Sequence, residues 1–154
     1  SPLPAEGTWP ARICCILTRK GSAAFSTPSR MTGEDPYLTQ DVPDCEPTAA
    51  LAAQDALEPL QYVANLTDGC RVGFRNFLFN GDQTMSLRLR GEAEGTLCVA
   101  TDQGIAARTA LSLKSGEWTD CSFPAALPVE EQPLYIDFEG SGHVDLQSFT
   151  FLEA

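Results

Sequence analysis

The strongest constraint on the fold is a succession of short strand-like segments that runs from residue 61 to the end of the chain. In residues 83–90, three apolar residues, Met85, Leu87 and Leu89, alternate with polar ones. This alternation places one face of a strand against a core and the other in solvent. Turn signals such as Asp68-Gly69 separate the segments. Similar strand-like runs are found at 61–66, 70–79, 96–101, 110–113, 118–123, 134–138 and 144–152.

Together with a strand at 11–18, this spacing predicts an all-β fold, a β-sandwich of two antiparallel sheets. Residues 41–60 do not show the strand pattern. Thr48 can cap a run of helix-favouring residues, and Pro59 ends that run, so we expect one short helix in this N-terminal insertion. We also expect a short strand at 37–40. The residues that we expect to point mostly inward are Met85, Leu87, Leu89, Leu97, Val99, Ile136, Phe138, Phe149 and Phe151.

The length of 154 residues suits a single domain. Residues 1–10 contain three prolines and one glycine and are expected to be a linker or domain junction, with the sandwich at 11–154. The chain begins with Ser1, and we expect a module taken from a longer polypeptide, with a partner domain on its N-terminal side. No apolar run approaches the roughly 20 residues that a membrane span needs.

The net charge of −11, from 10 basic and 21 acidic residues, opposes binding to nucleic acid and to anionic membranes. Neutral ligands such as sugars remain compatible with it. The chain has one histidine and no C-x-x-C, so a zinc site is not expected. Six cysteines allow three disulfides. Four of them lie in apolar or alternating segments: Cys14, Cys15, Cys98 and Cys121. This context favours mostly reduced, buried thiols and a reducing compartment or a bacterial source, but the sequence does not distinguish secreted from cytoplasmic locations.

No constellation typical of an enzyme is present. The sequence lacks G-x-S-x-G, H-E-x-x-H and a P-loop. His143 follows Gly140-Ser141-Gly142 in an expected hairpin loop, and the acidic pairs at 92/94 and 130/131 have turn-like contexts. We therefore expect no catalytic activity. An enzyme in its own right, such as a paired-carboxylate glycosidase, is the weakest of the alternative functions.

Two features are compatible with sugar binding. Trp118 lies at an expected loop-to-strand junction, where it either forms an exposed platform for the apolar face of a sugar or covers the end of the core. Arg88 and Arg90 share the outer face of their strand, which is either a surface for a ligand or partner domain or an ordinary solvated face.

The stretch from Tyr62 through Asp68-Gly69 to Phe79 resembles the hallmark of family 6 carbohydrate-binding modules, in which a strand, an Asp-Gly turn and an aromatic-rich strand follow one another. It is most similar to the modules at the C-terminus of family 43 glycoside hydrolases, the β-xylosidases and α-arabinofuranosidases. The resemblance covers residues 61–152 well and 11–60 loosely. It implies a jelly-roll sandwich. The later pieces that fit are Met85–Arg90, 95–99, 116–118, 134–138 and 144–151.

The resemblance also implies a binding site. Family members place one aromatic residue two positions after Asp-Gly, opposite a Trp from a later loop. Here the first position is Arg71, which could cover a sugar face or donate to hydroxyls, and the second is Trp118. In the family, an Asn also stands just before the last strand, and Asp145 takes its position here. The candidate ligand-binding residues are therefore Trp118, Asp145, Arg71 and His143.

The structural calcium of the family uses acidic residues of the first strand and an Asp near the C-terminus. Here the first strand has no carboxylate, and Gln147 takes the place of that Asp, so we expect the calcium site to be lost or altered. We expect no other cofactor.

The resemblance implies a non-catalytic module of a plant-cell-wall polysaccharide-degrading enzyme that binds xylan- or arabinoxylan-type β-glycans. The alternative is a structural accessory domain that packs on a family 43 catalytic domain without sugar affinity of its own. The implied partners are a polysaccharide or oligosaccharide and an N-terminal catalytic domain of the same polypeptide.

Overall fold

The computed structural model describes residues 1–13, 16–19 and 62–153, and nearly all of the regular structure in these ranges is β-strand. The helix expected in 41–60 and the strand expected at 37–40 lie outside the described residues. The elements are β1 (Leu3–Pro4), β2 (Gly7–Pro10), the 3-10 helix η1 (Ala11–Ile13), β3 (Ile16–Arg19), β4 (Val63–Leu66), β5 (Cys70–Leu78), β6 (Gln83–Thr101), β7 (Gly104–Ala125) and β8 (Glu131–Glu153).

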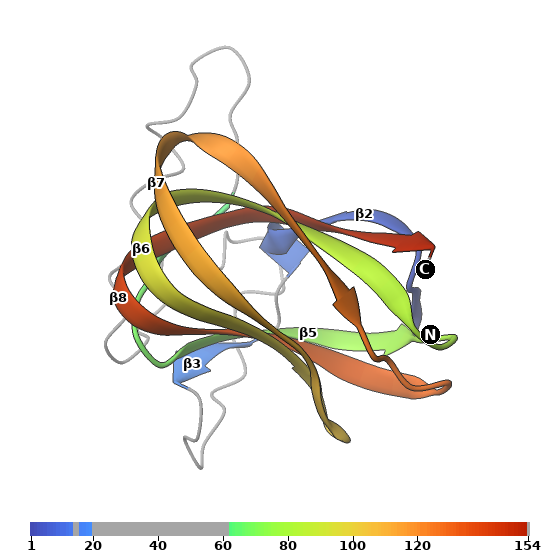
Figure 1. The fold of residues 1–154 in the computed structure, drawn as a ribbon. Helices are drawn as coiled ribbons and strands as arrows, with labels where there is room; N and C mark the ends of the chain where they lie inside the picture. Colours follow the sequence, from blue (N-terminus) through green and yellow to red (C-terminus); the bar gives the residue numbers. More distant parts are fainter. Residues whose placement is uncertain (14–15, 20–61, 154) are drawn as a thin grey trace.

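Three long strands, β6, β7 and β8, bend back on themselves and contribute to both layers of the sandwich (Figure 1). The first part of β6 pairs with residues 119–125 of β7 and 146–153 of β8. The last part of β6 pairs with residues 104–110 of β7 and 135–139 of β8. Each long strand thus covers what the sequence pattern indicates as two separate strands.

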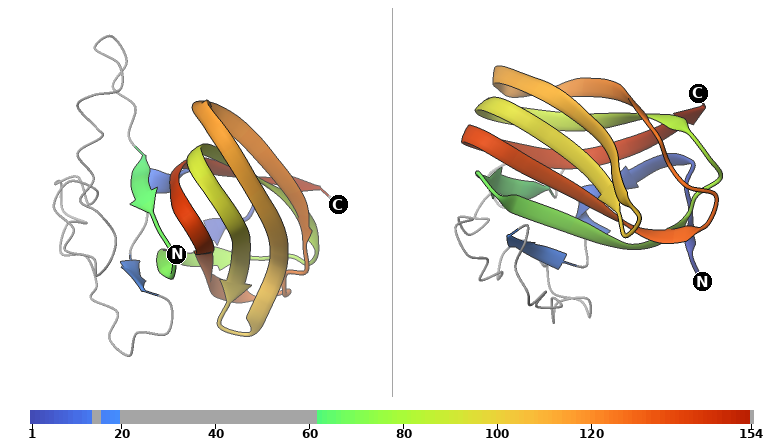
Figure 2. Two further views of the ribbon diagram at one scale, coloured as in Figure 1. Left: turned by 60° about the vertical axis from the view of Figure 1, so that its left-hand side comes forward. Right: turned by 60° about the horizontal axis from the view of Figure 1, so that its bottom comes forward.

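The short strands complete the two layers at their edges (Figure 2). β2 and β4 add to the second half of β8, antiparallel to it. β5 pairs with the first half of β8, and β3 lies antiparallel on the other edge of β5. β1 runs parallel to the end of β5 and is the single parallel pairing among the described strands. The result is the all-β sandwich that the sequence predicts.

Glycines allow the long strands to stay hydrogen-bonded around their bend. Gly140 and Gly142 of β8 have φ values of 145° and 84°, and a Cβ at either position would collide with a backbone carbonyl of β6. Residues with a side chain are strained in this backbone region. The predicted hairpin loop at Gly140–His143 is therefore wrong: these residues pair with 92–95 of β6. Glu92 and Glu94 likewise lie in a strand, although their side chains are exposed.

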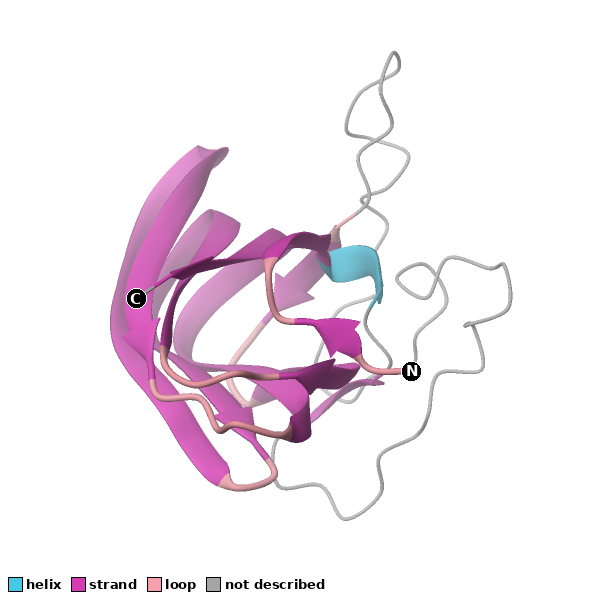
Figure 3. Ribbon diagram, turned by 90° about the vertical axis from the view of Figure 1, so that its right-hand side faces the viewer, coloured by secondary structure: helices cyan, strands magenta, loops and turns pink. Residues whose placement is uncertain are grey.

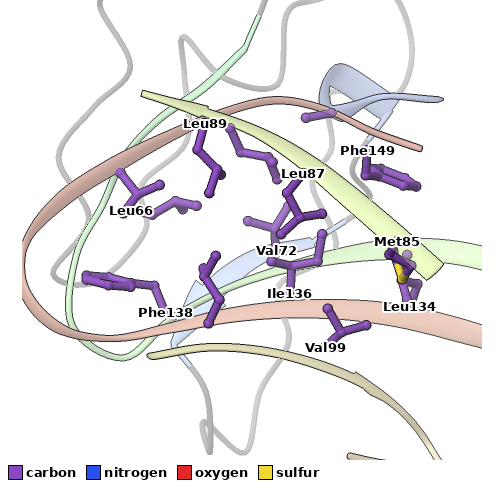
Figure 4. Packing of buried hydrophobic residues seen from close by; sticks show 14 of the residues in the cluster. Leu66, Val72, Met85, Leu87, Leu89, Val99, Leu134, Ile136, Phe138 and Phe149 are labelled. Carbon is purple, nitrogen blue, oxygen red and sulfur yellow. The ribbon is translucent and has the colours of Figure 1, made fainter. Parts of the chain in front are cut away.

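The core lies between the two layers (Figure 4). All nine residues that were expected to point inward are buried, and none is more than 4% exposed. Phe74 and Phe77 of β5 meet Phe149 of β8 across the layers, with ring centroids 4.6 and 5.9 Å apart. A third such contact, 5.3 Å, joins Phe77 to Phe151. Tilted and edge-on contacts of this kind add to the stabilisation that burial provides.

Two predicted features of the N-terminal region need correction. Residues 1–10 are not a linker in this structure, because β1 and β2 are hydrogen-bonded parts of the sheet. The Trp9 ring packs edge-on against Phe77 at 5.6 Å, and its indole N–H donates to the Pro4 carbonyl. The segment 11–18 is not a continuous strand, since η1 occupies its beginning and β3 starts only at Ile16.

The cysteines do not form one class. Cys98 and Cys121 are present as thiols, as expected. Cys70 is disulfide-bonded, so the expectation of reduced cysteines is wrong for this residue. Disulfides persist mainly in oxidising compartments, and the cysteines therefore no longer favour a reducing one. Within the described residues, no helix is long and apolar enough to cross a membrane.

Candidate functional site

A cleft of about 220 Å³ lies where the three long strands bend. It is lined by residues of all three strands: Arg90, Gly91 and Glu92 of β6, Ser115 and Gly116 of β7, and His143 and Asp145 of β8. The bend brings these residues together although they are distant in the sequence. Two of the four candidate ligand-binding residues, His143 and Asp145, therefore share one hollow.

Trp118 lies next to this cleft, beside Arg90. The guanidinium carbon of Arg90 is 4.4 Å from the centre of the Trp118 ring and 4.8 Å from the centre of the Tyr62 ring. Tyr62 contacts Trp118 edge-on, with ring centroids 5.1 Å apart. Trp118 is half-buried, whereas Tyr62 is 2% exposed. Trp118 is thus neither a free surface residue nor a core residue, and its ring is held from one side by a cation–π contact.

The carboxylate of Asp145, on β8, contacts the Arg90 guanidinium. Its Oδ2 is 3.3 Å from Nε of Arg90, and its Oδ1 accepts a 2.9 Å hydrogen bond from the backbone N–H of Asn65. Asn65 has a φ of 58°, in the left-handed region that Asn tolerates better than most residues, and it lies at an irregularity in the pairing of β4 with β8. This local bulge turns the amide of Asn65 towards the carboxylate.

The charges of Arg90 and Asp145 compensate each other within the site. The Arg90 and Asp145 side chains are 18% and 12% exposed, so each charge is largely removed from water and compensated by the other. Nη2 of Arg90 also donates a 2.7 Å hydrogen bond to the Tyr62 hydroxyl. Burial raises the pKa of Tyr62, and the nearby Arg90 opposes this rise in part. His143 is exposed at the rim, directly opposite Glu92 in the strand pairing.

Arg71 lies elsewhere and does not line the cleft. On β5, its Nε and Nη2 donate 2.6 and 2.9 Å hydrogen bonds to the two oxygens of Asp137, which is 1% exposed. Its guanidinium also covers the Tyr135 ring at 4.3 Å. The hydrogen bond to Asp137 raises the pKa of Arg71. The side chain is thus already engaged, and the structure does not bring it together with Trp118.

Sequence reasoning missed Tyr62 and Asn65 and did not separate Arg90 from Arg88. Arg88 forms an exposed 3.2 Å ion pair with Asp120, which fits a solvated face. Arg90 is instead enclosed by two aromatic rings and a carboxylate. The alternation that places both arginines on one face gives no signal for this difference, because the rings come from β4's N-terminal flank and from β7.

The expected loss or alteration of the family's calcium site stays a prediction for the described residues. They contain no group of three or more His, Cys, Asp or Glu side chains that could hold a metal. At Gln147, Oε1 is buried and has no hydrogen-bond partner among the described residues. One neutral amide oxygen supplies only one of the roughly six to eight oxygens that calcium needs.

Comparisons with known proteins place this fold. No family model matches the chain. A carbohydrate-binding module of family 6 from Clostridium stercorarium, solved with cellobiose, aligns over 100% of this chain and 98% of its own, with a TM-score of 0.68 and 10% identity. This chain has the fold of the family 6 carbohydrate-binding modules.

The same fold also occurs inside larger enzymes. A family 43 arabinoxylan arabinofuranohydrolase from Bacillus subtilis, solved with cellotetraose, aligns with 100% of this chain and 28% of its own length, with a TM-score of 0.64 and 11% identity. A curated xylosidase/arabinosidase from Thermoclostridium stercorarium is 29% identical over 152 residues, 97% of this chain. The chain spans 30% of the length of that relative.

Proposed function

We propose that this chain is a non-catalytic carbohydrate-binding module that binds xylan- or arabinoxylan-type β-glycans in the cleft at the strand bend. The observation that carries the proposal is the position of Trp118, half-buried beside a cleft that is lined by polar groups from three strands. A sugar ring has an apolar face that stacks on an aromatic ring and hydroxyls that need donors and acceptors around it.

In this proposal the protein recognises sugar with a preformed site. Arg90, held by Asp145 and Tyr62, fixes the Trp118 ring before any ligand arrives. Binding then costs little side-chain entropy. The carboxylates of Glu92 and Asp145 can accept hydrogen bonds from hydroxyls, and Ser115 and His143 can donate or accept them. A single platform supports modest affinity, because Tyr62, the ring that contacts Trp118, is buried.

The names of the relatives support the choice of glycan. The curated relative is a xylosidase/arabinosidase, and an enzyme in which 28% of the chain has this fold is named an arabinoxylan arabinofuranohydrolase. A module of this kind would keep a linked catalytic domain close to its polysaccharide, which raises the effective concentration of substrate. The catalytic domain of the same polypeptide is part of this proposal.

A structural accessory role is the second candidate function. One observation favours it: Arg71 is fully engaged with Asp137, so the two-sided aromatic site of the family is incomplete. In this case the sandwich would pack on a catalytic domain and would have no affinity for free sugars.

Affinity electrophoresis with a panel of polysaccharides separates the two. We expect retardation in gels that contain xylan or arabinoxylan and little in gels with unrelated glucans. Incubation with the same polysaccharides should release no reducing ends. The absence of retardation in every gel would favour the accessory role, and release of reducing ends that depends on one carboxylate would contradict both candidates.

A further inference from the structure

The cleft at the strand bend presents one exposed charge to a ligand. Among its lining residues, Arg90, Glu92 and Asp145 carry a full charge at neutral pH. Arg90 and Asp145 form an ion pair whose side chains are 18% and 12% exposed, so their charges compensate each other within the wall of the cleft. Glu92 is exposed, and none of the ion pairs among the described residues includes it. The charge that a ligand meets in this cleft is therefore the carboxylate of Glu92.

The strand pairing fixes the surroundings of this carboxylate. Glu92 lies on β6 directly between Lys114 of β7 and His143 of β8. His143 lines the cleft, whereas Lys114 does not and lies on the other side of Glu92. Lys114 is exposed and belongs to none of the ion pairs of the described residues, so its ammonium group in water compensates Glu92 only weakly. Glu92 therefore keeps most of its charge on the ligand side.

A carboxylate in this position distinguishes neutral sugars from acidic ones. It accepts hydrogen bonds from the hydroxyls of a neutral pentose or hexose, and such charge-assisted bonds are stronger than those between neutral groups. A uronic acid is ionised at neutral pH, and its own carboxylate has no proton to donate and repels that of Glu92. Arg90 does not offset this repulsion, because its guanidinium already donates to Asp145 and to the Tyr62 hydroxyl.

We propose that Glu92 makes the cleft selective for neutral glycans, so that the module discriminates against xylan that carries glucuronic acid. This inference rests on the proposed function and deepens it, because it divides xylans into a neutral class that the cleft accepts and an acidic class that it disfavours. Two like unit charges about 4 Å apart change a binding equilibrium about fivefold even at the dielectric constant of water. A single carboxylate is therefore sufficient for measurable selectivity.

Calorimetric titration with a matched pair of ligands tests the proposal. One ligand is a xylo-oligosaccharide with a single glucuronic acid side group, and the other is the same compound after reduction of the carboxyl group to an alcohol. The two ligands have nearly the same shape and differ in one charge. We expect the 154-residue protein to bind the reduced ligand at least about fivefold more tightly at low ionic strength. This ratio should fall below about twofold in 1 M salt, where the Debye length is about 3 Å.

Two variants separate the charge of Glu92 from the net charge of the chain. Glu92→Gln keeps an acceptor oxygen and removes the charge, so the ratio of the two affinities should fall below about twofold. The matched control is Asp82→Asn, which changes the net charge by the same amount at an exposed residue that does not line the cleft. Asp82 lies in the connection between β5 and β6, on the side of the sandwich that faces the viewer in Figure 3, away from the bend of the long strands. Asp82→Asn should keep the ratio of the parent, and both variants should melt at the temperature of the parent.

Unsubstituted xylotetraose, titrated in the same way, tests the proposed function alone. If the parent does not bind it, the proposed function fails and this inference fails with it. If the parent binds xylotetraose but binds the charged ligand as tightly as the reduced one, or more tightly, only the selectivity of Glu92 is overturned. A ratio that persists in Glu92→Gln or falls equally in Asp82→Asn has the same meaning, as does binding of xylotetraose but of neither substituted ligand, which would report selection by shape.

Discussion

The guanidinium carbon of Arg90 lies 4.4 Å from the centre of the Trp118 ring. Arg90 lies on β6, whose first part shows the clearest alternation in the sequence. Trp118 is the residue that the resemblance marks as the platform for a sugar. Asp145 and Tyr62 hold the guanidinium from the other sides. Trp118, Arg90, Asp145 and Tyr62 therefore act as one unit, and a change in one of them should alter the others.

Arg90→Ala tests this unit. The substitution removes two cation–π contacts and the charged hydrogen bonds to Tyr62 and Asp145, and it leaves Asp145 partly buried without its cation. We expect a loss of about 2–3 kcal/mol in the free energy of unfolding, measured by chemical denaturation. The matched control is Arg88→Ala on the same strand face, whose exposed ion pair with Asp120 should contribute less than about 1 kcal/mol. Equal effects of the two substitutions would contradict the special role of Arg90.

Asp137→Ala tests whether the second arginine is structural. Asp137 is 1% exposed and accepts both hydrogen bonds from Arg71, so its removal leaves a largely enclosed guanidinium without a counter-charge. We expect destabilisation of about 3 kcal/mol in chemical denaturation. Affinity for xylo-oligosaccharides should stay within about twofold of the parent, since a change of 1.4 kcal/mol is needed for a factor of ten. A large loss of affinity in a folded variant would place Arg71 in the binding site after all.

The tyrosines should make the protein sensitive to alkali. Burial raises the pKa of Tyr62 and of Tyr135 above the ordinary value of 10.0, so the folded state holds these protons more tightly than the unfolded state. The stability that this provides is complete below the ordinary value and is lost as the pH rises above it. We expect the melting temperature to fall in that range. Tyr62→Phe, which removes one of the two groups, should reduce the slope of the fall. An unchanged slope would exclude a contribution from Tyr62.

Calcium should not contribute to stability. The described residues lack a suitable group of ligands, and Gln147 stands where the family has an Asp. We expect the same melting temperature with calcium and with a chelator of divalent cations, measured by differential scanning calorimetry. A fall of several degrees on chelation that calcium reverses would show that a site exists.

The sequence predicts the core of this fold well, because burial follows the period-2 pattern directly. Met85, Leu87 and Leu89 alternate cleanly, and all three are buried. The pattern could not show that the strands continue around their bend. Gly140 and Gly142 look like turn residues, yet they serve a close approach of β6 and β8 within a continuous ladder. Pro2 and Pro4 likewise made the first ten residues look like a linker, although prolines are tolerated in edge strands such as β1.

The candidate site was predicted only in part, because its contacts join residues that are far apart in the chain. Trp118 and Asp145 follow from the resemblance, and both belong to the group around Arg90. Arg71 does not, and its partner Asp137 is 66 positions away, so local sequence could not indicate that its guanidinium is already engaged. Tyr62 gave no signal of its own, since an aromatic residue next to a strand is usually part of the core.

The most direct test of the central claim is isothermal titration calorimetry of the 154-residue protein and of Trp118→Ala with xylo-, arabinoxylo- and cello-oligosaccharides. We expect the parent to bind xylan-type ligands and Trp118→Ala to lose at least about tenfold in affinity, because a stacking aromatic is worth about 0.5–1.5 kcal/mol beyond its buried area. Ile105→Ala, an exposed position of β7 that does not line the cleft, serves as the control and should bind like the parent. Unchanged affinity in a well-folded Trp118→Ala variant, or no binding by the parent, would contradict the account.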